Sequence, residues 1–210
     1  MTATTTPLMG VDIGQKRDPT ALCVAQMEKR EGSRKLEWHY LVRHLERLPL
    51  RTPYPDVVRR VETVAGGVRA KTGNSPELYV DATGVGTPIV DLLRDGAPAV
   101  RSVIAVYFTH GDRRTETSEG GRKRVSLGKA WIVSRLQALL QTGRIHLPET
   151  SEARALAQEL LDFEIRVDEN ANDKYGAFRV GTHDDLVTAL GLAVQIENQG
   201  PTGGVSYLPW

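Results

Sequence analysis

The stretch LMGVDIG, residues 8–14, predicts a short buried strand that ends in an acid, Asp12, followed shortly by a glycine, Gly14. Two more extended runs follow after short turns, TALCVAQME (residues 20–28) and KLEWHYLVRHLERL (residues 35–48). This tight spacing favours three consecutive antiparallel strands. The first strand therefore delivers an acid at its carboxyl end.

The next segments alternate between helix and strand. Valines at helical spacing predict a helix over residues 54–71, and SPELYVDATG (residues 75–84) predicts a fourth strand that again ends in an acid and a glycine. GTPIVDLLRDG (residues 86–96) predicts a short helix, and VRSVIAVYFT (residues 100–109) a fifth strand. The fourth and fifth strands would form a parallel, right-handed βαβ unit. The result is a mixed five-stranded sheet flanked by helices, in the order found in RNase H-like folds.

The second half of the chain predicts a loop, two helices and a hairpin before the last helix. Residues 110–124 are a polar run without an apolar anchor, which indicates a loop. Residues 126–143 and 151–163 have helical patterns, and Ser151 is the expected N-cap of the second helix. Over residues 163–181 apolar and polar residues alternate, a run of turn-forming residues follows, and the alternation then resumes. This pattern predicts an added β-hairpin.

The composition is that of a soluble intracellular protein. The 210 residues suit a single domain, expected over residues 1–198, with a flexible Gly- and Pro-rich tail over residues 199–210. With 27 basic and 26 acidic residues the net charge is only +1, so the overall positive charge of many nucleic-acid binders is missing. The single cysteine, Cys23, lies in an apolar run and predicts a buried strand residue. A membrane span and a signal peptide are not expected.

The acids of the chain stand where they could converge. Asp12 and Asp81 end the first and fourth strands, and Asp184 and Asp185 begin the last helix. Carboxyl ends of neighbouring strands deliver side chains to one edge of a sheet, and the last helix can add a carboxylate there. Clustered carboxylates repel one another unless divalent cations neutralise them, and oxygen ligands suit Mg²⁺ or Mn²⁺ better than zinc. Two such ions would support hydrolysis of a phosphodiester by water.

Each acid also has an ordinary structural interpretation. An Asp at a strand end often forms an Asx turn, and an Asp before a helix often caps it. The adjacent pair is harder to explain, because one cap needs only one acid. The pair therefore favours a cation site over a purely structural role.

Three segments carry a specific resemblance: VDIGQKRDPTALCV, LYVDATGVGTPIVDLL and GTHDDLVTALGLAV. Together, over about residues 8–198, they resemble the nuclease domain of phage terminase large subunits, the motors that package viral DNA. The resemblance implies an RNase H-like endonuclease that cuts concatemeric DNA with two Mg²⁺ or Mn²⁺ ions and little sequence preference. It also implies double-stranded DNA, a terminase ATPase domain, a small terminase subunit and a portal protein as partners, in the cytoplasm of an infected bacterium.

By position, the resemblance assigns the metal-binding acids and two residues near the site. The assigned residues are Asp12, Asp81, Asp184 and Asp185 as catalytic metal ligands, with Asp18 and His183 as auxiliary residues. Periodicity does not decide between Asp184 and Asp185 as the direct ligand, and we favour Asp185. One feature departs from a full large subunit: GRKRVSLGKA is not a P-loop, because its spacing is wrong and no Ser or Thr follows the lysine. We therefore expect an isolated nuclease domain or a stand-alone relative that cannot drive translocation.

DNA contacts are expected in the polar loop. The loop carries five basic residues that could grip phosphates near the acids: Arg113, Arg114, Arg122, Lys123 and Arg124. It is equally compatible with an ordinary solvated loop. The hairpin over residues 163–181 could guide DNA, or could simply extend the sheet.

Three other functions fit parts of the pattern. Actin-like ATPases and sugar kinases use similar VDIG and DATGVG strings, but they need two such domains, and the turn after Asp12 lacks the expected threonines. Another RNase H-like nuclease, such as a Holliday-junction resolvase, would differ by its activity on four-way junctions. A non-catalytic module that binds DNA or a capsid is the third alternative, disfavoured because all the acids are present.

Overall fold

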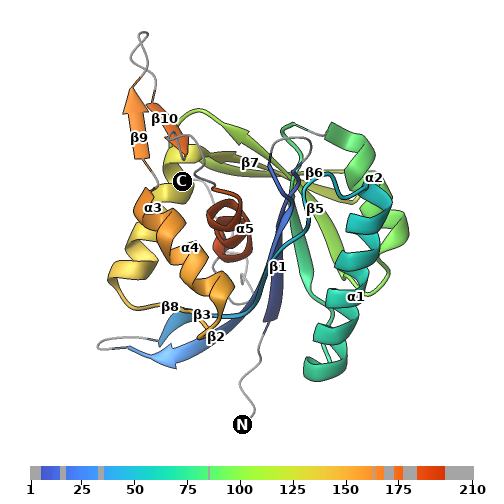
Figure 1. Cartoon of the computed structure of the whole chain (residues 1–210), viewed down its shortest axis with the longest axis horizontal. Helices are drawn as coiled ribbons and strands as arrows, with labels where there is room; N and C mark the ends of the chain where they lie inside the picture. The colour runs from blue at the N-terminus through green and yellow to red at the C-terminus, as the bar shows by residue number, and fades with distance from the viewer. Residues whose placement is uncertain are drawn as a thin grey trace, which may run out of the picture.

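A central sheet lies between two layers of helices in the computed structural model of the chain (Figure 1). The structure describes residues 6–14, 18–32, 36–84, 86–162, 164–167, 173–176 and 184–196. One face of the sheet is covered by α1 (Tyr54–Thr72) and α2 (Gly86–Gly96). The other face is covered by α3 (Lys129–Gln141), α4 (Ser151–Asp162) and α5 (Asp185–Val194).

The sheet contains eight strands in the order β6-β7-β5-β4-β1-β2-β3-β8. Its members are β1 (Thr6–Asp12), β2 (Ala21–Glu31), β3 (Leu36–Arg47), β4 (Glu77–Asp81), β5 (Ser102–Thr109), β6 (Arg114–Glu119), β7 (Arg122–Gly128) and β8 (Ile145–His146). β1, β2 and β3 are antiparallel neighbours, whereas β4 runs parallel to both β1 and β5. The predicted RNase H-like order of three antiparallel strands and a βαβ unit is therefore confirmed.

The prediction of a polar loop over residues 110–124 is wrong. Most of these residues form β6 and the start of β7, which pair as an antiparallel hairpin, and β7 also joins the sheet beside β5. Gly120 and Gly121 make the turn with φ angles of 55° and 75°, the conformation that Gly-Gly pairs favour in tight hairpins. The anchor of the hairpin is Val125 and Leu127, whose side chains are fully buried and lie just beyond the polar run.

Smaller differences concern helix boundaries and the second hairpin. The N-cap of α4 is Thr150 and not Ser151, because the Thr150 hydroxyl accepts the N–H of Ala153 at 3.2 Å. The predicted hairpin before the last helix is present as β9 (Glu164–Val167) and β10 (Asp173–Gly176), which pair only with each other. The predicted flexible tail, residues 199–210, lies outside the described residues.

Two apolar clusters fill the spaces between the layers. One lies under α3, α4 and α5 and contains Cys23, whose burial was predicted; the other lies under α1 and α2. Nine of the ten residues of α5 are buried, which makes it the most enclosed helix among the described residues. Within the described ranges no helix is both long enough and apolar enough to cross a membrane.

The helix α5 packs directly on the backbone of β1 at Gly10. A β-carbon at this position would lie 2.0 Å from the carbonyl oxygen of Ala189 and 2.6 Å from the amide nitrogen of Ala193. On its other side α5 meets α3 through Gly191, where a β-carbon would lie 2.4 Å from Ile132. Glycine at both contacts lets α5 lie against β1, so that its first residues reach the carboxyl end of that strand.

Replacement of Gly10 tests this close contact. Gly10→Ala should destabilise the fold by about 2 kcal/mol or more, because the backbone of α5 cannot yield as a flexible side chain would. Gly67→Ala on α1 is the matched control, since nothing lies within 4 Å of its added methyl group. That control should be neutral or should stabilise by about 0.5–1 kcal/mol. Urea unfolding of both variants measures the difference, and a Gly10→Ala variant as stable as Gly67→Ala would contradict the packing described.

Candidate metal-binding active site

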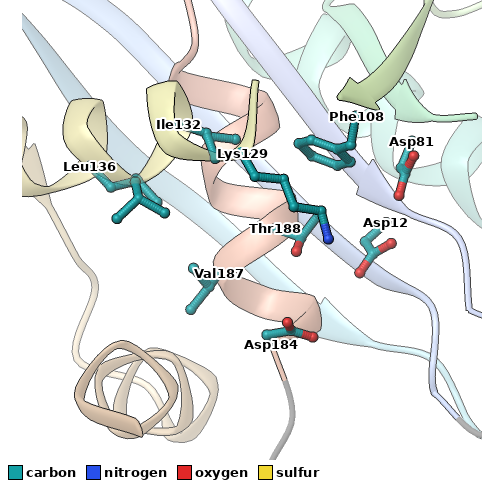
Figure 2. Close-up of a pocket in the computed structure, with 10 residues that line it drawn as sticks. Asp12, Asp81, Phe108, Lys129, Ile132, Leu136, Asp184, Val187 and Thr188 are labelled. Carbon is teal, nitrogen blue, oxygen red and sulfur yellow. The ribbon is translucent and has the colours of Figure 1, made fainter. Parts of the chain in front are cut away.

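Asp12 and Asp81 come together because their strands are parallel neighbours. The register pairs Val11 with Val80, so the next residue of each strand is an aspartate at the same edge of the sheet. This is the edge at which α/β sheets collect ligands. Both carboxylates line one cavity of about 170 Å³ and point toward its interior in Figure 2.

The third acid of this cavity is Asp184, at the start of α5. It lines the cavity with Asp12 and Asp81, and Thr188 lies one helical turn further along on the same side (Figure 2). Asp184 occupies the N-cap position, yet within the described residues its side chain makes no capping hydrogen bond. Capping therefore does not explain this acid, whose carboxylate belongs to the cavity.

Asp81 does form the Asx turn expected of a strand-end aspartate. Its Oδ1 accepts the N–H of Thr83 at 2.8 Å, and the Thr83 hydroxyl in turn accepts the N–H of Phe108 at 2.8 Å. These bonds hold the carboxylate against β5 at the edge of the cavity. The structural and functional interpretations of Asp81 are thus compatible, because the Asx turn orients the side chain and leaves lone pairs for a cation.

Asp12 lies in an environment that disfavours its charge. Burial raises the pKa of its carboxyl well above the ordinary value, and the charges of Asp81, Asp185, Asp184 and Asp18 raise it further. Asp18 itself is exposed, in the turn that follows β1. A cation in the cavity would reverse this effect, so the chemistry of the donor set fits a hard divalent ion.

Asp185 has different partners. Its side chain is only 2% exposed, and its Oδ2 accepts the Nε–H of Arg47 at 2.5 Å. The other side of the same guanidinium pairs with Glu159 of α4. The structure therefore separates the adjacent acids: Asp184 lines the cavity with Asp12 and Asp81, and Asp185 lies in a buried ion-pair network.

Glu159 supplies the cap that Asp184 does not. Its Oε2 accepts the N–H groups of Leu186 and Val187 at 3.0 and 3.1 Å, which are orphan donors in the first turn of α5. A carboxylate at a helix N-terminus is also favoured by the helix dipole. Through Glu159, the helix α4 fixes the end of α5 that carries Asp184. Nothing in the sequence indicated Glu159 or Arg47, because their roles depend on contacts between distant segments.

Lys129 is a further side chain that sequence analysis missed. It begins α3, lines the cavity with Phe108, and carries its amino group toward Asp12 and Thr188 (Figure 2). Its Nζ lies 5.9 Å from the centre of the Phe108 ring. The position of Lys129 could be recognised only with knowledge of the β6–β7 hairpin, because β7 places the start of α3 at the acidic edge of the sheet. His183, predicted near the site, lies outside the described residues.

The β6–β7 hairpin distributes the predicted DNA-binding residues over both faces of the sheet. Arg114 and Lys123 line a groove beside α3 and the end of α5, whereas Arg122 and Arg124 line a second groove beside α2, to which Lys123 also contributes. Arg124 stacks on Tyr107, with its guanidinium carbon 3.8 Å from the ring centre. Arg113 is exposed just before β6. The five basic residues therefore do not form one cluster.

Comparison with known proteins identifies the family. The family model for the terminase RNaseH-like domain matches residues 9–197. The chain belongs to this family. The resemblance recognised in the sequence is thereby confirmed.

Solved terminase nucleases have the same fold. The large terminase nuclease from thermophilic phage G20c is similar with a TM-score of 0.59 and 19% identity, over 91% of this chain and 82% of that chain. The same nuclease with bound magnesium gives a TM-score of 0.58 and 20% identity, over 90% of this chain and 80% of that chain. The human cytomegalovirus terminase nuclease domain gives a TM-score of 0.58 and 14% identity, over 92% of this chain and 84% of that chain. No curated protein sequence matches the chain significantly.

Neutralisation of Asp12 should stabilise this terminase domain when no metal is bound. The folded state raises the pKa of Asp12, so the free energy of unfolding falls as pH rises above the ordinary pKa of an aspartate. In EDTA at about pH 7, Asp12→Asn should raise the Tm, by about 2–4 °C for each 1 kcal/mol of repulsion removed. The difference should shrink on acidification, because the wild-type carboxyl then becomes protonated.

The exposed Asp95 of α2 provides the control for this measurement. Asp95→Asn should leave the Tm in EDTA nearly unchanged, because surface substitutions usually change stability by less than about 0.5 kcal/mol. A lower Tm for Asp12→Asn than for wild type at neutral pH would show that the Asp12 charge is stabilised and not opposed by its surroundings.

The adjacent acids should respond differently to the same substitution. Asp185→Asn replaces one of the two carboxylates that pair with Arg47 by a neutral amide, so it weakens a buried charge-assisted hydrogen bond and should destabilise the protein by about 1–2 kcal/mol. Asp184→Asn removes a charge that repels Asp12, so in EDTA it should raise the Tm slightly. It should also abolish the rise in Tm produced by Mn²⁺, because it removes a proposed ligand of an ion that binds only the folded protein. Thermal unfolding with EDTA and with Mn²⁺ measures both effects. If instead Asp185→Asn abolished the effect of Mn²⁺ and Asp184→Asn destabilised the protein, Asp185 would be the ligand.

Proposed function

We propose that the chain is a metal-dependent endodeoxyribonuclease that cuts concatemeric viral DNA during genome packaging, with little sequence preference. The observation that carries the proposal is the convergence of Asp12, Asp81 and Asp184 on one cavity, in a member of the terminase RNase H-like family. The magnesium bound to the related phage G20c nuclease supports the choice of ion.

In this proposal Asp12, Asp81 and Asp184 hold two divalent ions, Mg²⁺ or Mn²⁺. Among the described residues, no three acidic, histidine or cysteine side chains are already close enough to bind one ion together. We therefore expect rotation of the carboxylates to complete the ligand set. When bound, the ions would activate water and stabilise charge on the reacting phosphate. Asp185 remains a secondary candidate for a ligand, with Asp18 and His183 as auxiliary residues.

The remaining side chains of the cavity would position the substrate. The amino group of Lys129, which extends toward Asp12 (Figure 2), is placed to donate to a non-bridging oxygen of a phosphate bound in the cavity. Phe108, Ile132 and Val187 form an apolar wall. This wall limits the access of bulk water, which strengthens the electrostatic contacts inside the cavity.

Double-stranded DNA is the proposed substrate, and the proposed partners are those of a packaging motor. They are a terminase ATPase domain, a small terminase subunit and a portal protein, in the cytoplasm of an infected bacterium. The proposed contacts to the DNA backbone are the cationic residues in and just before the β6–β7 hairpin: Arg113, Arg114, Arg122, Lys123 and Arg124.

Cleavage of supercoiled plasmid tests the proposal. The purified chain should nick and linearise plasmid with Mg²⁺ or Mn²⁺ and should be inactive in EDTA. Asp12→Asn and Asp81→Asn should each lower the rate at least about 100-fold, because each removes a charge that binds the ions. Asp95→Asn should cleave like wild type. Absence of metal-dependent cleavage at high enzyme concentration and low salt would contradict the nuclease assignment and favour a DNA-binding module.

A further inference from the structure

A second cavity lies at the opposite end of α5 from the acids. It has a volume of about 490 Å³ and is bounded by the starts of β1 and β4, by β2, β6, β7 and α3, and by the residues that follow α5. We call it the Gln195 groove, after the residue at its base. It is separate from the acidic cavity, although α3 contributes side chains to both: Lys129 and Ile132 to one, Trp131 and Arg135 to the other.

Gln195 presents a buried hydrogen-bond donor to this groove. The residue is 1% exposed, and its Oε1 accepts the Nε–H of Arg114 at 3.2 Å. A guanidinium can only donate, so this bond fixes the amide orientation and leaves the NH₂ group as the remaining donor. Among the residues that the structure describes, Nε2 has no acceptor. A buried donor left without an acceptor costs about 1–3 kcal/mol, so the groove is suited to a ligand that accepts hydrogen bonds.

The charges around the groove define the ligand further. Four cationic side chains line it, Arg101, Arg114, Lys123 and Arg135, against two carboxylates, Glu77 and Glu116. Glu116 is shared by Arg114 and Lys123 at 3.0 and 3.2 Å, and Arg101 pairs with Glu77. The excess of positive charge, together with the Gln195 donor, suits an anion with several acceptor oxygens, such as a phosphate.

The distance between the groove and Asp184 indicates where on a bound DNA duplex this phosphate would lie. The ten-residue helix α5 separates the groove from Asp184, a distance of about 15 Å at 1.5 Å per residue. A duplex rises by about 3.4 Å per base pair, so this distance corresponds to about four to five base pairs. We propose that the Gln195 groove binds a backbone phosphate of the DNA about four to five base pairs from the bond held at the acids. This inference rests on the proposed DNA substrate.

DNA binding without cleavage tests this site. The probe is a fluorescein-labelled duplex of about 20 base pairs, with fluorescence anisotropy measured in EDTA over a range of salt concentrations. Arg114→Gln should weaken binding on the order of eight-fold at about 0.1 M salt and should lower the salt slope by about 0.9, the value for one lost phosphate contact. Gln195→Glu should also weaken binding, because it replaces the donor with a carboxylate while keeping an acceptor for Arg114.

Two further variants keep the test decisive. Lys123→Gln, on an exposed side chain, replaces Gln195→Glu if the buried substitution prevents folding, and should again lower the slope. Lys71→Gln, exposed at the end of α1 on the other face of the sheet, removes the same charge and should leave Kd within about two-fold of wild type. Groove variants that bind DNA as Lys71→Gln does would overturn the proposal.

The result can be separated from that of the nuclease assay. Weakened DNA binding by the groove variants supports the proposed phosphate site even if the wild type cleaves no plasmid, because binding is measured without metal. Unchanged DNA binding by these variants overturns the assignment of the groove to a DNA phosphate even if cleavage is metal-dependent. A labelled polyglutamate peptide serves as a second probe. Tighter binding of this peptide than of DNA, lost in Gln195→Glu, would assign the groove to an acidic protein partner and overturn the assignment to DNA.

Discussion

The backbone contact between β1 and α5 at Gly10 determines where the acids of this protein meet. Any side chain at Gly10 would collide with the main chain of α5, so glycine is what allows the buried helix to lie against the strand. Because β1 continues for two residues beyond this contact to Asp12, and α5 begins beside that edge, one contact brings Asp184 to the end of the strand. The parallel pairing of β1 with β4 then adds Asp81.

The buried network around Arg47 explains why two acids begin α5. Asp185 and Glu159 share the guanidinium, and Glu159 also accepts the first free N–H groups of the helix. A helix start that is held in this way cannot easily turn or fray, so the preceding residue, Asp184, is kept at the cavity. One acid of the pair thus holds the start of the helix, and the other lines the cavity.

Much of this arrangement could be predicted from the sequence, because it depends on local patterns. The alternation of apolar runs and glycine turns predicted β1, β4 and the βαβ unit, with an aspartate at the end of β1 and of β4. The two acids meet because β1 and β4 are parallel neighbours, which the sequence analysis had only as a condition. Other features depend on contacts between distant segments and were missed. The hairpin of β6 and β7 is polar along most of its length, and its anchor, Val125 and Leu127, is buried only because β7 pairs with β5. The partners of Asp185 could not be recognised for the same reason: periodicity places both acids near the edge of the helix but cannot show that Asp185 pairs with Arg47.

A crystal structure of the protein soaked in Mn²⁺, with anomalous scattering recorded at the manganese edge, would show whether three carboxylates from β1, β4 and the start of α5 hold divalent ions, as we propose. We expect anomalous peaks between Asp12, Asp81 and Asp184, with Asp185 still paired to Arg47. Peaks ligated by Asp185 after loss of the Arg47 pair, or no peak in this cavity at saturating Mn²⁺, would contradict this proposal.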